Sequence, residues 1–288
     1  MKIIIRNCNV AELDIPLKYA TKLYNEFAIR HPNAFYLRTR QRGMQNWDGK
    51  IKYITKTGQF KIGLLPSVYK RCIELGIKPI IVDMRQPLPK VSKVVTQIGK
   101  YKLRPEQEKA VKAILSNKLG ETPFQIGVLD YTVNAGKTLI MSALYLSYKK
   151  QLKTLLITND SDWLNQARDE FKQYLPGEDI TFVQGKVLNW SNFTIGMVQS
   201  ISRNMKYYQN ELAKIDMVLI DEADQGGSKQ YQNVITRLFN TRVRIGLSGT
   251  IYMSKLAKDK VKNMNLRCFF GDVIAEFKLK DSIKKGYS

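Results

Sequence analysis

Apolar positions in the carboxyl-terminal two thirds of the chain form short runs that alternate with helix-like spacings. The runs lie at 125–129, 154–158, 180–183, 193–198, 217–221 and 243–248, and the helical spacings lie at 105–115, after 136, at 162–174, after 200 and at 229–239. Such runs predict strands buried on both faces, because crossover helices cover both sides of a parallel sheet. We therefore predict an α/β fold with a parallel sheet and helices on both faces.

The first hundred residues have shorter and more mixed elements. Apolar runs at 2–5 and 78–82 have the length of strands, and residues 16–29 and 66–75 carry apolar side chains at a helical period. Residues 50–54 alternate basic and apolar side chains, as a strand with one solvated face does. These elements predict a small α+β domain.

A linker-like segment separates the two patterns. Residues 85–99 contain Pro87, Pro89 and scattered lysines, a composition typical of a connection between domains. The expected organisation is a small α+β domain with its linker at 1–100, followed by the α/β domain at 101–288.

Basic residues greatly outnumber acidic ones. The 288-residue chain has 47 Lys and Arg against 25 Asp and Glu, a net charge of +22. The first hundred residues hold 19 of the basic and 6 of the acidic residues, so this third alone carries 19 − 6 = +13. Such an excess favours a polyanionic partner, above all nucleic acid. The alternatives are a surface charged for solubility and a membrane surface.

Cysteine and histidine usage excludes several kinds of site. Cys8, Cys72 and Cys268 are far apart, with neither metal-type spacing nor an even disulfide framework, which indicates a reducing cytoplasm. His31 is the only histidine and lies before a proline in a polar turn, which disfavours Ser-His-Asp or Cys-His catalysis. No apolar run approaches the ~18 residues of a membrane span, so no membrane-spanning segment is expected, and nucleic acid is preferred to a membrane as the partner.

The octapeptide YTVNAGKT at 131–138 has the context of a phosphate-binding loop (Walker A). It lies between an apolar strand and an apolar helix, although Tyr131 stands where such loops have a small residue. Backbone amides from Asn134 to the helix start would face an anion there. Ala135 and Gly136 belong to the same loop, and Gly136 lets the backbone approach closely. Lys137 would reach the β- and γ-phosphates of ATP, and the Thr138 hydroxyl would ligate Mg²⁺.

A second acidic segment completes the predicted site. Four apolar residues at 217–220 run into Asp221-Glu222-Ala223-Asp224, which places carboxylates at the end of a buried strand. Ligands of doubly wound sheets bind at that edge. Asp221 is expected to hold Mg²⁺, and Glu222 to orient and deprotonate the attacking water. The alternative is a solvated acidic helix start. Together with the lysine loop upstream, the pair predicts ATP turnover with Lys137, Asp221 and Glu222 as catalytic residues.

Six short motifs occur in the order typical of superfamily 2 helicases. They are LRPEQ at 103–107, YTVNAGKT at 131–138, the run 154–158 with Asn159 beyond it, GMVQS at 196–200, DEAD at 221–224 and SGT at 248–250. The chain resembles this family over about half its length. The resemblance implies a RecA-like sheet, adenine binding by the segment of Arg104 and Gln107, and coupling of the ATP state to DNA grip through Ser248 and Thr250.

The amino-terminal region narrows the resemblance. NWDGKI at 46–51 and GLLP at 63–66, followed by the helicase core, are similar to phage UvsW-type helicases, which carry a small accessory DNA-binding domain in front. The resemblance implies unwinding or branch migration of forked or Holliday-type DNA in recombination and repair, in a host cytoplasm if the gene is a phage gene. RNA helicases share DEAD, but usually carry Ser-Ala-Thr in place of SGT and a longer aromatic segment before Gln107. RNA remains an alternative.

Two groups of side chains are candidates for nucleic-acid contacts. The first, in the basic amino-terminal region, comprises Arg38, Arg40, Arg42, Trp47, Lys50 and Lys52. Basic side chains at alternate positions of a strand lie on one face and would contact phosphates. Trp47 either stacks on a base or packs in the core. The second group, beside the core motifs, comprises Asn159, Gln199, Ser200 and Arg203. Phosphate contacts carry no sequence information, so binding is expected to depend on DNA structure.

Superfamily 2 helicases have a second RecA-like domain, which supplies an arginine to the ATP site. The motifs found end at Thr250, so we expect the chain to be an amino-terminal portion of a longer helicase, with little hydrolysis on its own. The open alternatives are a branched-DNA binder without turnover, an RNA helicase and the motor subunit of a restriction enzyme.

Overall fold

The computed structural model describes residues 1–41, 43–91, 93–185, 190–252 and 257–287. The chain divides into two compact units. The first comprises Met1–Met84 with Tyr252–Gly271, and the second comprises Arg85–Ile251 with Asp272–Ser288. This division differs from the predicted boundary at residue 100 in two ways: the predicted linker 85–99 belongs to the second unit, and Tyr252–Gly271 returns to the first.

A four-stranded sheet in the order β5-β2-β1-β6 forms the centre of the first unit. Its elements are β1 (Lys2–Ile5), β2 (Val10–Asp14), α1 (Leu17–Glu26), β5 (Gln59–Lys61), the 3₁₀ turn η1 (Ile62–Leu64), α3 (Leu65–Glu74) and β6 (Ile80–Asp83). β1 pairs antiparallel with β2 and parallel with β6. Ile3 and Ile5 of β1 are buried while Lys2 is exposed, so the strand alternates as its sequence predicts.

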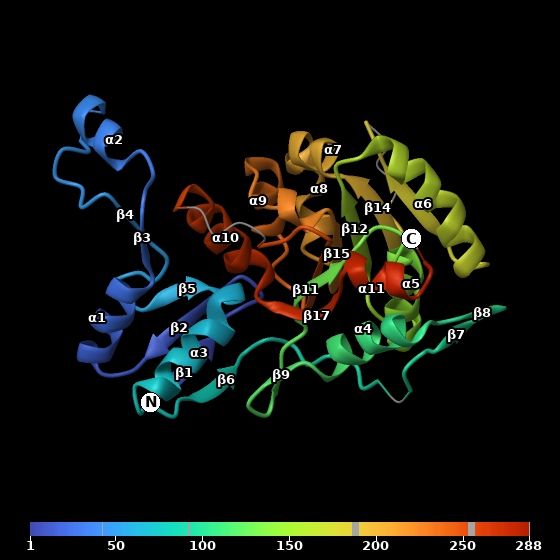
Figure 1. Ribbon diagram of the computed structural model, residues 1–288, viewed down its shortest axis with the longest axis horizontal. Helices are drawn as coiled ribbons and strands as arrows, with labels where there is room; N and C mark the ends of the chain where they lie inside the picture. Colours follow the sequence, from blue (N-terminus) through green and yellow to red (C-terminus); the bar gives the residue numbers. More distant parts are fainter. Residues whose placement is uncertain (42, 92, 186–189, 253–256, 288) are drawn as a thin grey trace. The chain divides into compact units, whose positions relative to one another are not determined.

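A two-stranded ribbon extends the first unit. β3 (Ala28–Arg30) pairs antiparallel with β4 (Lys50–Lys52), and α2 (Ala34–Arg40) lies in the connection between them (Figure 1). The predicted helix over 16–29 was wrong at its end. Helix α1 stops at Glu26, because the backbone of residues 28–30 is used by the pairing with β4.

Helix α10 (Ala257–Phe270) belongs to the first unit although it follows most of the second in sequence. The Tyr53 hydroxyl donates a 3.0 Å hydrogen bond to Oδ1 of Asn265 on this helix. At Gly63 in η1, an added Cβ would lie 2.1 Å from the carbonyl oxygen of Arg267 and 2.7 Å from that of Cys268. Gly63 therefore allows the backbones of η1 and α10 to approach closely.

Replacing Gly63 with alanine is expected to destabilise the first unit by at least about 1–3 kcal/mol, the usual cost of overpacking. The new methyl group would overlap backbone carbonyls, which cannot rotate away as a flexible side chain can. Urea denaturation followed by circular dichroism measures the effect. Gly43→Ala is the control, because it meets no atom within 4 Å and carries only the backbone cost of its positive φ. Wild-type stability in Gly63→Ala would contradict the packing of α10 on η1.

A seven-stranded sheet in the order β13-β14-β12-β15-β16-β11-β17 forms the second unit, and all its strand pairs are parallel. The strands are β11 (Ile126–Tyr131), β12 (Thr154–Thr158), β13 (Ile180–Val183), β14 (Phe193–Met197), β15 (Met217–Asp221), β16 (Val243–Ser248) and β17 (Val273–Phe277). Every residue of β11, β12, β15 and β16 is buried, as expected for strands covered on both faces. The predicted α/β fold with a RecA-like parallel sheet is confirmed.

Two groups of helices flank this sheet (Figure 1). The first comprises α4 (Pro105–Ser116), α5 (Lys137–Ser147) and α6 (Ser161–Tyr174), which pack in that order. The second comprises α7 (Val198–Arg203), α8 (Met205–Leu212) and α9 (Lys229–Ile235). The remaining elements are β7 (Gln97–Ile98), β8 (Tyr101–Lys102), β9 (Lys118–Leu119), β10 (Thr122–Pro123), the 3₁₀ turn η2 (Ala223–Gln225) and α11 (Leu279–Lys284). Among the described residues, no helix is long and apolar enough to span a bilayer.

Candidate active site

Three neighbouring strands end beside one another at the carboxyl edge of the large sheet. β16 lies between β15 and β11, with Asp221 of β15 opposite Leu247 and Asp130 of β11 opposite Ser248. Because the strands are parallel, the loops that follow them leave the sheet on the same side. The loop 131–137, the acidic segment 221–224 and the SGT segment 248–250 therefore start from adjacent positions.

The loop before α5 turns through two left-handed residues. Asn134 has φ 61° and Gly136, the N-cap of α5, has φ 70°. A Cβ at Gly136 would lie 2.3 Å from Nε2 of Gln107. Both the backbone conformation and the crowding therefore require glycine at this position. The first amides of a helix lack intrahelical acceptors, and these amides together with the helix dipole favour an anion at the start of α5.

Lys137 and Asp221 face one another across this edge. The Lys137 Nζ lies 3.7 Å from Oδ1 of Asp221, which is an ion pair beyond hydrogen-bonding distance. Asp221 is only 6% exposed, and its Oδ1 has no hydrogen-bond donor. Burial raises the pKa of Asp221, and the charge of Lys137 opposes that rise. A buried carboxylate oxygen without a donor needs a cation close to it.

The oxygen ligands at this place fit Mg²⁺. The Asp221 carboxylate and the buried Thr138 hydroxyl are hard oxygen donors. The described residues contain no group of three or more His, Cys, Asp or Glu side chains able to hold a metal on their own. Nucleotide sites do not need one, because Mg²⁺ there takes one or two protein oxygens and completes its shell with phosphates and water.

Glu222 follows Asp221 in a left-handed conformation with φ 51°. Its side chain is exposed to solvent. Loss of hydration, followed by the charges of Asp221 and Asp224, raises the pKa of Glu222. A carboxylate with a raised pKa is a better proton acceptor than an ordinary one, which is what a general base requires.

Ser248 connects the acidic segment to the SGT segment. Its buried hydroxyl donates a 2.8 Å hydrogen bond to Oδ1 of Asp224, and the backbone amide of Thr250 donates to Ser248 Oγ at 3.2 Å. Thr250 itself is exposed. Hydrogen bonds therefore join the acidic segment after β15 to the SGT segment after β16.

The start of α4 is hydrogen-bonded to the loop before α5. Gln107 accepts a 2.8 Å hydrogen bond from the Arg104 amide, and its Nε2 donates to the carbonyl oxygen of Ala135 at 2.9 Å. The Arg104 Nη2 donates to the carbonyl oxygen of Asn134 at 3.2 Å. In this structure the Gln107 amide is therefore bonded to the protein, and Arg104 lies against the loop.

Tyr131, the unusual first residue of the loop, has a structural role. Its side chain is fully buried, and its hydroxyl donates a 2.8 Å hydrogen bond to the backbone oxygen of Glu106 in α4. Burial, and then the charge of Glu106, raises the pKa of Tyr131 to about 12, so the hydroxyl stays protonated and able to donate. A small residue here would remove this hydrogen bond between the loop and α4.

The core candidates for nucleic-acid contacts follow the carboxyl ends of β12 and β14. The Gln199 Nε2 donates to the carbonyl oxygen of Asn159 at 3.2 Å, so the ends of β12 and β14 are joined. Ser200 accepts a 3.0 Å hydrogen bond from the Gly185 amide. Arg203 is exposed on the last turn of α7. The structure thus brings Asn159 and Gln199 together and leaves Arg203 open to solvent.

The amino-terminal candidates divide into two kinds. Arg38 and Arg40 are exposed on α2, and Arg42 lies outside the described residues. Lys50 is exposed on β4, but Lys52 forms a 3.1 Å ion pair with Asp48 and lies 4.7 Å above the Tyr24 ring. Trp47 is half-buried, and its indole nitrogen donates to the carbonyl oxygen of Lys50 at 3.0 Å. Lys52 and Trp47 are therefore partly committed to contacts within the unit.

Several residues near these sites were not singled out by the sequence. Phe35 and Tyr36 on α2 are 80% and 53% exposed, and the adjacent aromatic pair just before the arginines of the stretch FYLRTR at 35–40 was the signal for them. Asp224 was predicted only as part of its tetrapeptide. Tyr231 of α9 is buried, its hydroxyl has no partner, and burial followed by the charges of Asp221 and Glu222 raises its pKa. No sequence pattern points to Tyr231.

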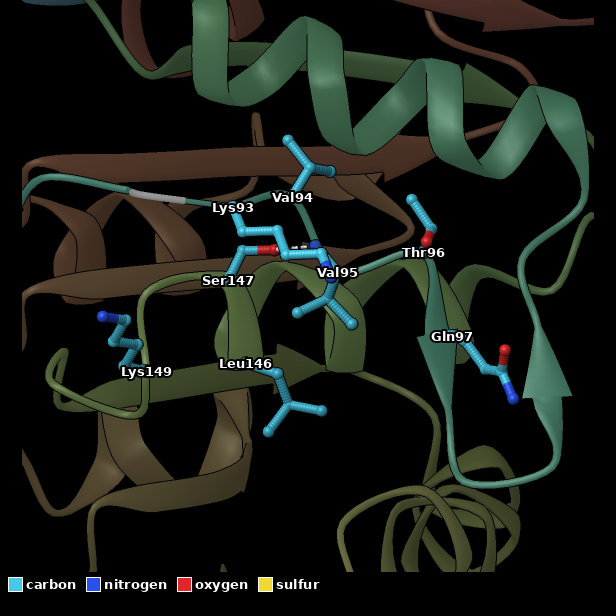
Figure 2. A pocket seen from close by; sticks show the side chains of 8 residues that line it. All are labelled: Lys93, Val94, Val95, Thr96, Gln97, Leu146, Ser147 and Lys149. Carbon is cyan, nitrogen blue, oxygen red and sulfur yellow. Dashed lines mark hydrogen bonds between the residues drawn. The ribbon is translucent and has the colours of Figure 1, made fainter.

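A separate pocket lies at the other end of α5. It has a volume of about 380 Å³ and lies between Leu146, Ser147 and Lys149 and the extended segment 93–97 (Figure 2). The Val95 amide donates to Ser147 Oγ at 3.0 Å on its wall. Because α5 begins at Lys137 and ends at Ser147, this pocket is distinct from the candidate nucleotide site.

The chain is similar in sequence to two curated helicases. Two curated relatives are a putative ATP-dependent RNA helicase L396 of Acanthamoeba polyphaga mimivirus, 26% identical over 147 residues, and the ATP-dependent DNA helicase uvsW of Enterobacteria phage T4, 24% identical over 227 residues. These alignments cover 51% and 72% of this chain, but only 27% and 43% of the relatives. The chain therefore spans less than half the length of either protein.

Solved structures share the fold. The crystal structure of the UvsW helicase from bacteriophage T4 superposes with a TM-score of 0.73 at 20% identity, over 96% of this chain and 100% of that one. A second T4 UvsW structure gives a TM-score of 0.72 at 21% identity, over 96% of this chain and 57% of that one.

A family model described as "Type III restriction enzyme, res subunit" matches residues 100–253, which is more than half of the chain and contains all three loops of the candidate site. The resemblance to superfamily 2 helicases is thereby confirmed. The chain belongs to this family of superfamily 2 helicase domains.

Proposed function

We propose that this chain is the nucleotide-binding part of an ATP-dependent DNA helicase or translocase that acts on branched DNA. The observation that carries the proposal is the approach of Lys137 to a buried Asp221 at the carboxyl edge of the sheet, at 3.7 Å. The Lys137 ammonium provides a positive charge for the phosphates of a triphosphate. The Asp221 carboxylate, which has no hydrogen-bond donor at Oδ1, provides a negative charge for the metal ion that the triphosphate carries.

Each site residue has a distinct role in this proposal. Lys137 and the amides at the start of α5 bind the β- and γ-phosphates, and Thr138 and Asp221 would hold Mg²⁺. Bound there, the metal neutralises charge on the phosphate oxygens. Glu222 accepts a proton from the attacking water. The Ser248–Asp224 hydrogen bond transmits the state of the site to Thr250 and the segment beyond.

The nucleic-acid part of the proposal rests on charge and on α2. The net charge of +22 favours a polyanion, and α2 presents Arg38 and Arg40 beside exposed Phe35 and Tyr36. Arginines bind backbone phosphates, while exposed rings stack on unpaired bases, which occur where a duplex forks. The relative named as a DNA helicase supports DNA as the substrate.

The wider context follows from the same resemblance. We propose a role in recombination and repair, in a host cytoplasm if the gene belongs to a phage. Turnover in this proposal also requires a second RecA-like domain, whose arginine can contribute about 10³–10⁵ in rate.

The proposal is tested with the complete gene product and forked DNA. Forked DNA is expected to stimulate ATP hydrolysis, and the double variant Arg38→Ala/Arg40→Ala is expected to need more DNA for half-maximal stimulation. Losing two phosphate contacts should reduce the slope of log K against log salt by about 2. A coupled ATPase assay at several salt concentrations measures both. The matched control is Lys109→Ala/Lys112→Ala, two exposed lysines of α4.

Three results would count against the proposal. Hydrolysis without any DNA response would contradict the helicase assignment, and equal salt slopes in the two double variants would contradict the role of α2. Stimulation by forked RNA but not by forked DNA would favour the RNA helicase alternative, which the mimivirus relative's name supports.

A further inference from the structure

The segment after β17 folds back onto the start of α4. Lys285 Nζ lies 2.8 Å from Oε2 of Glu106, and the guanidinium carbon of Arg104 lies 4.3 Å from the centre of the Tyr287 ring. At that distance the planar guanidinium lies over the ring face, where the ring's quadrupole attracts a cation. This segment therefore reaches a residue that contacts the phosphate loop.

A row of rings continues this contact into the loop. The Tyr287 ring centre lies 6.5 Å from that of Phe277 at the end of β17, and Phe277 lies 6.0 Å from Tyr131. Both separations are within the range of favourable aromatic pairs. Tyr131 is the first residue of the phosphate loop, so the row extends from the entrance of the loop to Arg104.

Two hydrogen bonds also connect the start of α4 to the loop. The Arg104 Nη2 donates to the carbonyl oxygen of Asn134 in the loop at 3.2 Å, and the Tyr131 hydroxyl donates to the carbonyl oxygen of Glu106 at 2.8 Å. Arg104 is thus bound through its edge to the loop and, by Nε at 3.2 Å, to Oε1 of Glu106, and through one face to Tyr287. Its side chain remains 26% exposed, so part of the guanidinium stays accessible.

This arrangement fixes a flexible side chain in one plane. A free arginine loses considerable rotamer entropy when it stacks on a ligand, and a side chain already ordered by Tyr287 loses less. The Gln107 amide is bonded to the Arg104 amide and to Ala135. Arg104 is therefore the residue of this segment that offers a preformed planar group to a nucleobase.

We propose that Tyr287 is a positioning residue for purine selection: it holds the Arg104 guanidinium beside the phosphate loop so that the guanidinium stacks on the adenine of bound ATP. The inference rests on the proposed nucleotide site and goes beyond it by adding a determinant of base choice from outside the helicase motifs. A purine has a larger face than a pyrimidine, so it gains more from an ordered stacking partner.

Nucleotide affinities of the 288-residue chain test the inference. Isothermal titration calorimetry with Mg²⁺ is used to compare ATP with CTP, and the wild type is expected to prefer ATP. Tyr287→Ala is expected to raise the Kd for ATP about 3- to 10-fold, the range of a partly desolvated cation–π contact, and the Kd for CTP less than about 2-fold. Tyr287→Phe keeps the ring and should keep the wild-type ratio. Lys284→Ala, an exposed neighbour on α11, should also leave the ratio unchanged.

A purely structural role would give a different pattern. If Tyr287→Ala weakened ATP and CTP equally, or if the ratio in Tyr287→Phe fell to that in the alanine variant, the inference would be overturned. Tyr287→Leu keeps apolar packing against Phe277 without the ring face, so it should show the same selective loss as Tyr287→Ala even if the alanine variant folds poorly. A wild-type chain that binds neither nucleotide would overturn the proposed site itself, whereas ATP binding with an unchanged ratio in Tyr287→Leu would overturn only the role of Tyr287.

Discussion

Replacing Lys137 with alanine is expected to raise the Kd for Mg·ATP at least about 100-fold, which corresponds to about 2.7 kcal/mol. The Lys137 ammonium lies 3.7 Å from Asp221 and is the cation at the mouth of the loop before α5. Charge-assisted hydrogen bonds to phosphate are each worth about 1.5–3 kcal/mol, and the variant loses all those that Lys137 makes. Titration calorimetry on the 288-residue chain measures the change.

A control variant has to separate the effect of the charge at Lys137 on ATP affinity from the effect of the protein's net charge. Lys172→Ala removes one positive charge from the exposed face of α6 and should leave the affinity unchanged. If both variants bound Mg·ATP with wild-type affinity, the loop before α5 would not be a phosphate site. If both lost affinity equally, the effect would come from net charge and not from the position of Lys137.

Replacing Glu222 with glutamine is expected to slow ATP hydrolysis by about 100-fold or more and to change the Kd for ATP by less than about 2-fold. Glutamine has the same shape, but its amide cannot accept a proton from water. The Glu222 side chain is exposed, so the substitution leaves the core intact. It also removes a negative charge beside Asp221 and Asp224, which slightly favours binding of an anion.

Single-turnover hydrolysis with the complete gene product and DNA separates the chemical step from nucleotide binding. Glu121→Gln makes the same chemical change at a side chain that is 94% exposed and should hydrolyse ATP at the wild-type rate. Near-normal turnover by Glu222→Gln would exclude this carboxylate as the base. A parallel loss of ATP affinity would show that Glu222 acts in binding.

The parallel sheet was predictable because burial on both faces leaves a plain pattern in the sequence. The predicted bounds 154–158, 180–183, 217–221 and 243–248 are those of β12, β13, β15 and β16. β17 was missed, because this edge strand is only partly buried and its sequence VIAEF gives no continuous apolar run.

The first unit was harder to predict, since its elements are short and their partners are distant in sequence. β2 and β5 were missed, because polar residues interrupt both and their pairing with each other holds them in place. The return of α10 to this unit depends on packing between segments about 200 residues apart, for which local periodicity carries no signal.

The proximity of Lys137 and Asp221 follows from strand order and a general rule about parallel sheets. The contacts that hold the loop in place cannot be predicted from that rule. The bonds of Tyr131 to Glu106 and of Ser248 to Asp224 depend on side-chain conformation, and the stacking of Tyr287 on Arg104 depends on where the segment after β17 folds back. Motif spacing gives positions along the chain, whereas these contacts arise only in the folded unit.

A crystal structure of the chain with a non-hydrolysable ATP analogue and Mn²⁺ tests the central claim most directly. We predict an anomalous peak for the metal between the Thr138 hydroxyl and the Asp221 carboxylate, with the β- and γ-phosphates within hydrogen-bonding distance of Lys137 Nζ. A nucleotide bound elsewhere, such as in the pocket beside Ser147 (Figure 2), with no metal at Asp221, would contradict the claim.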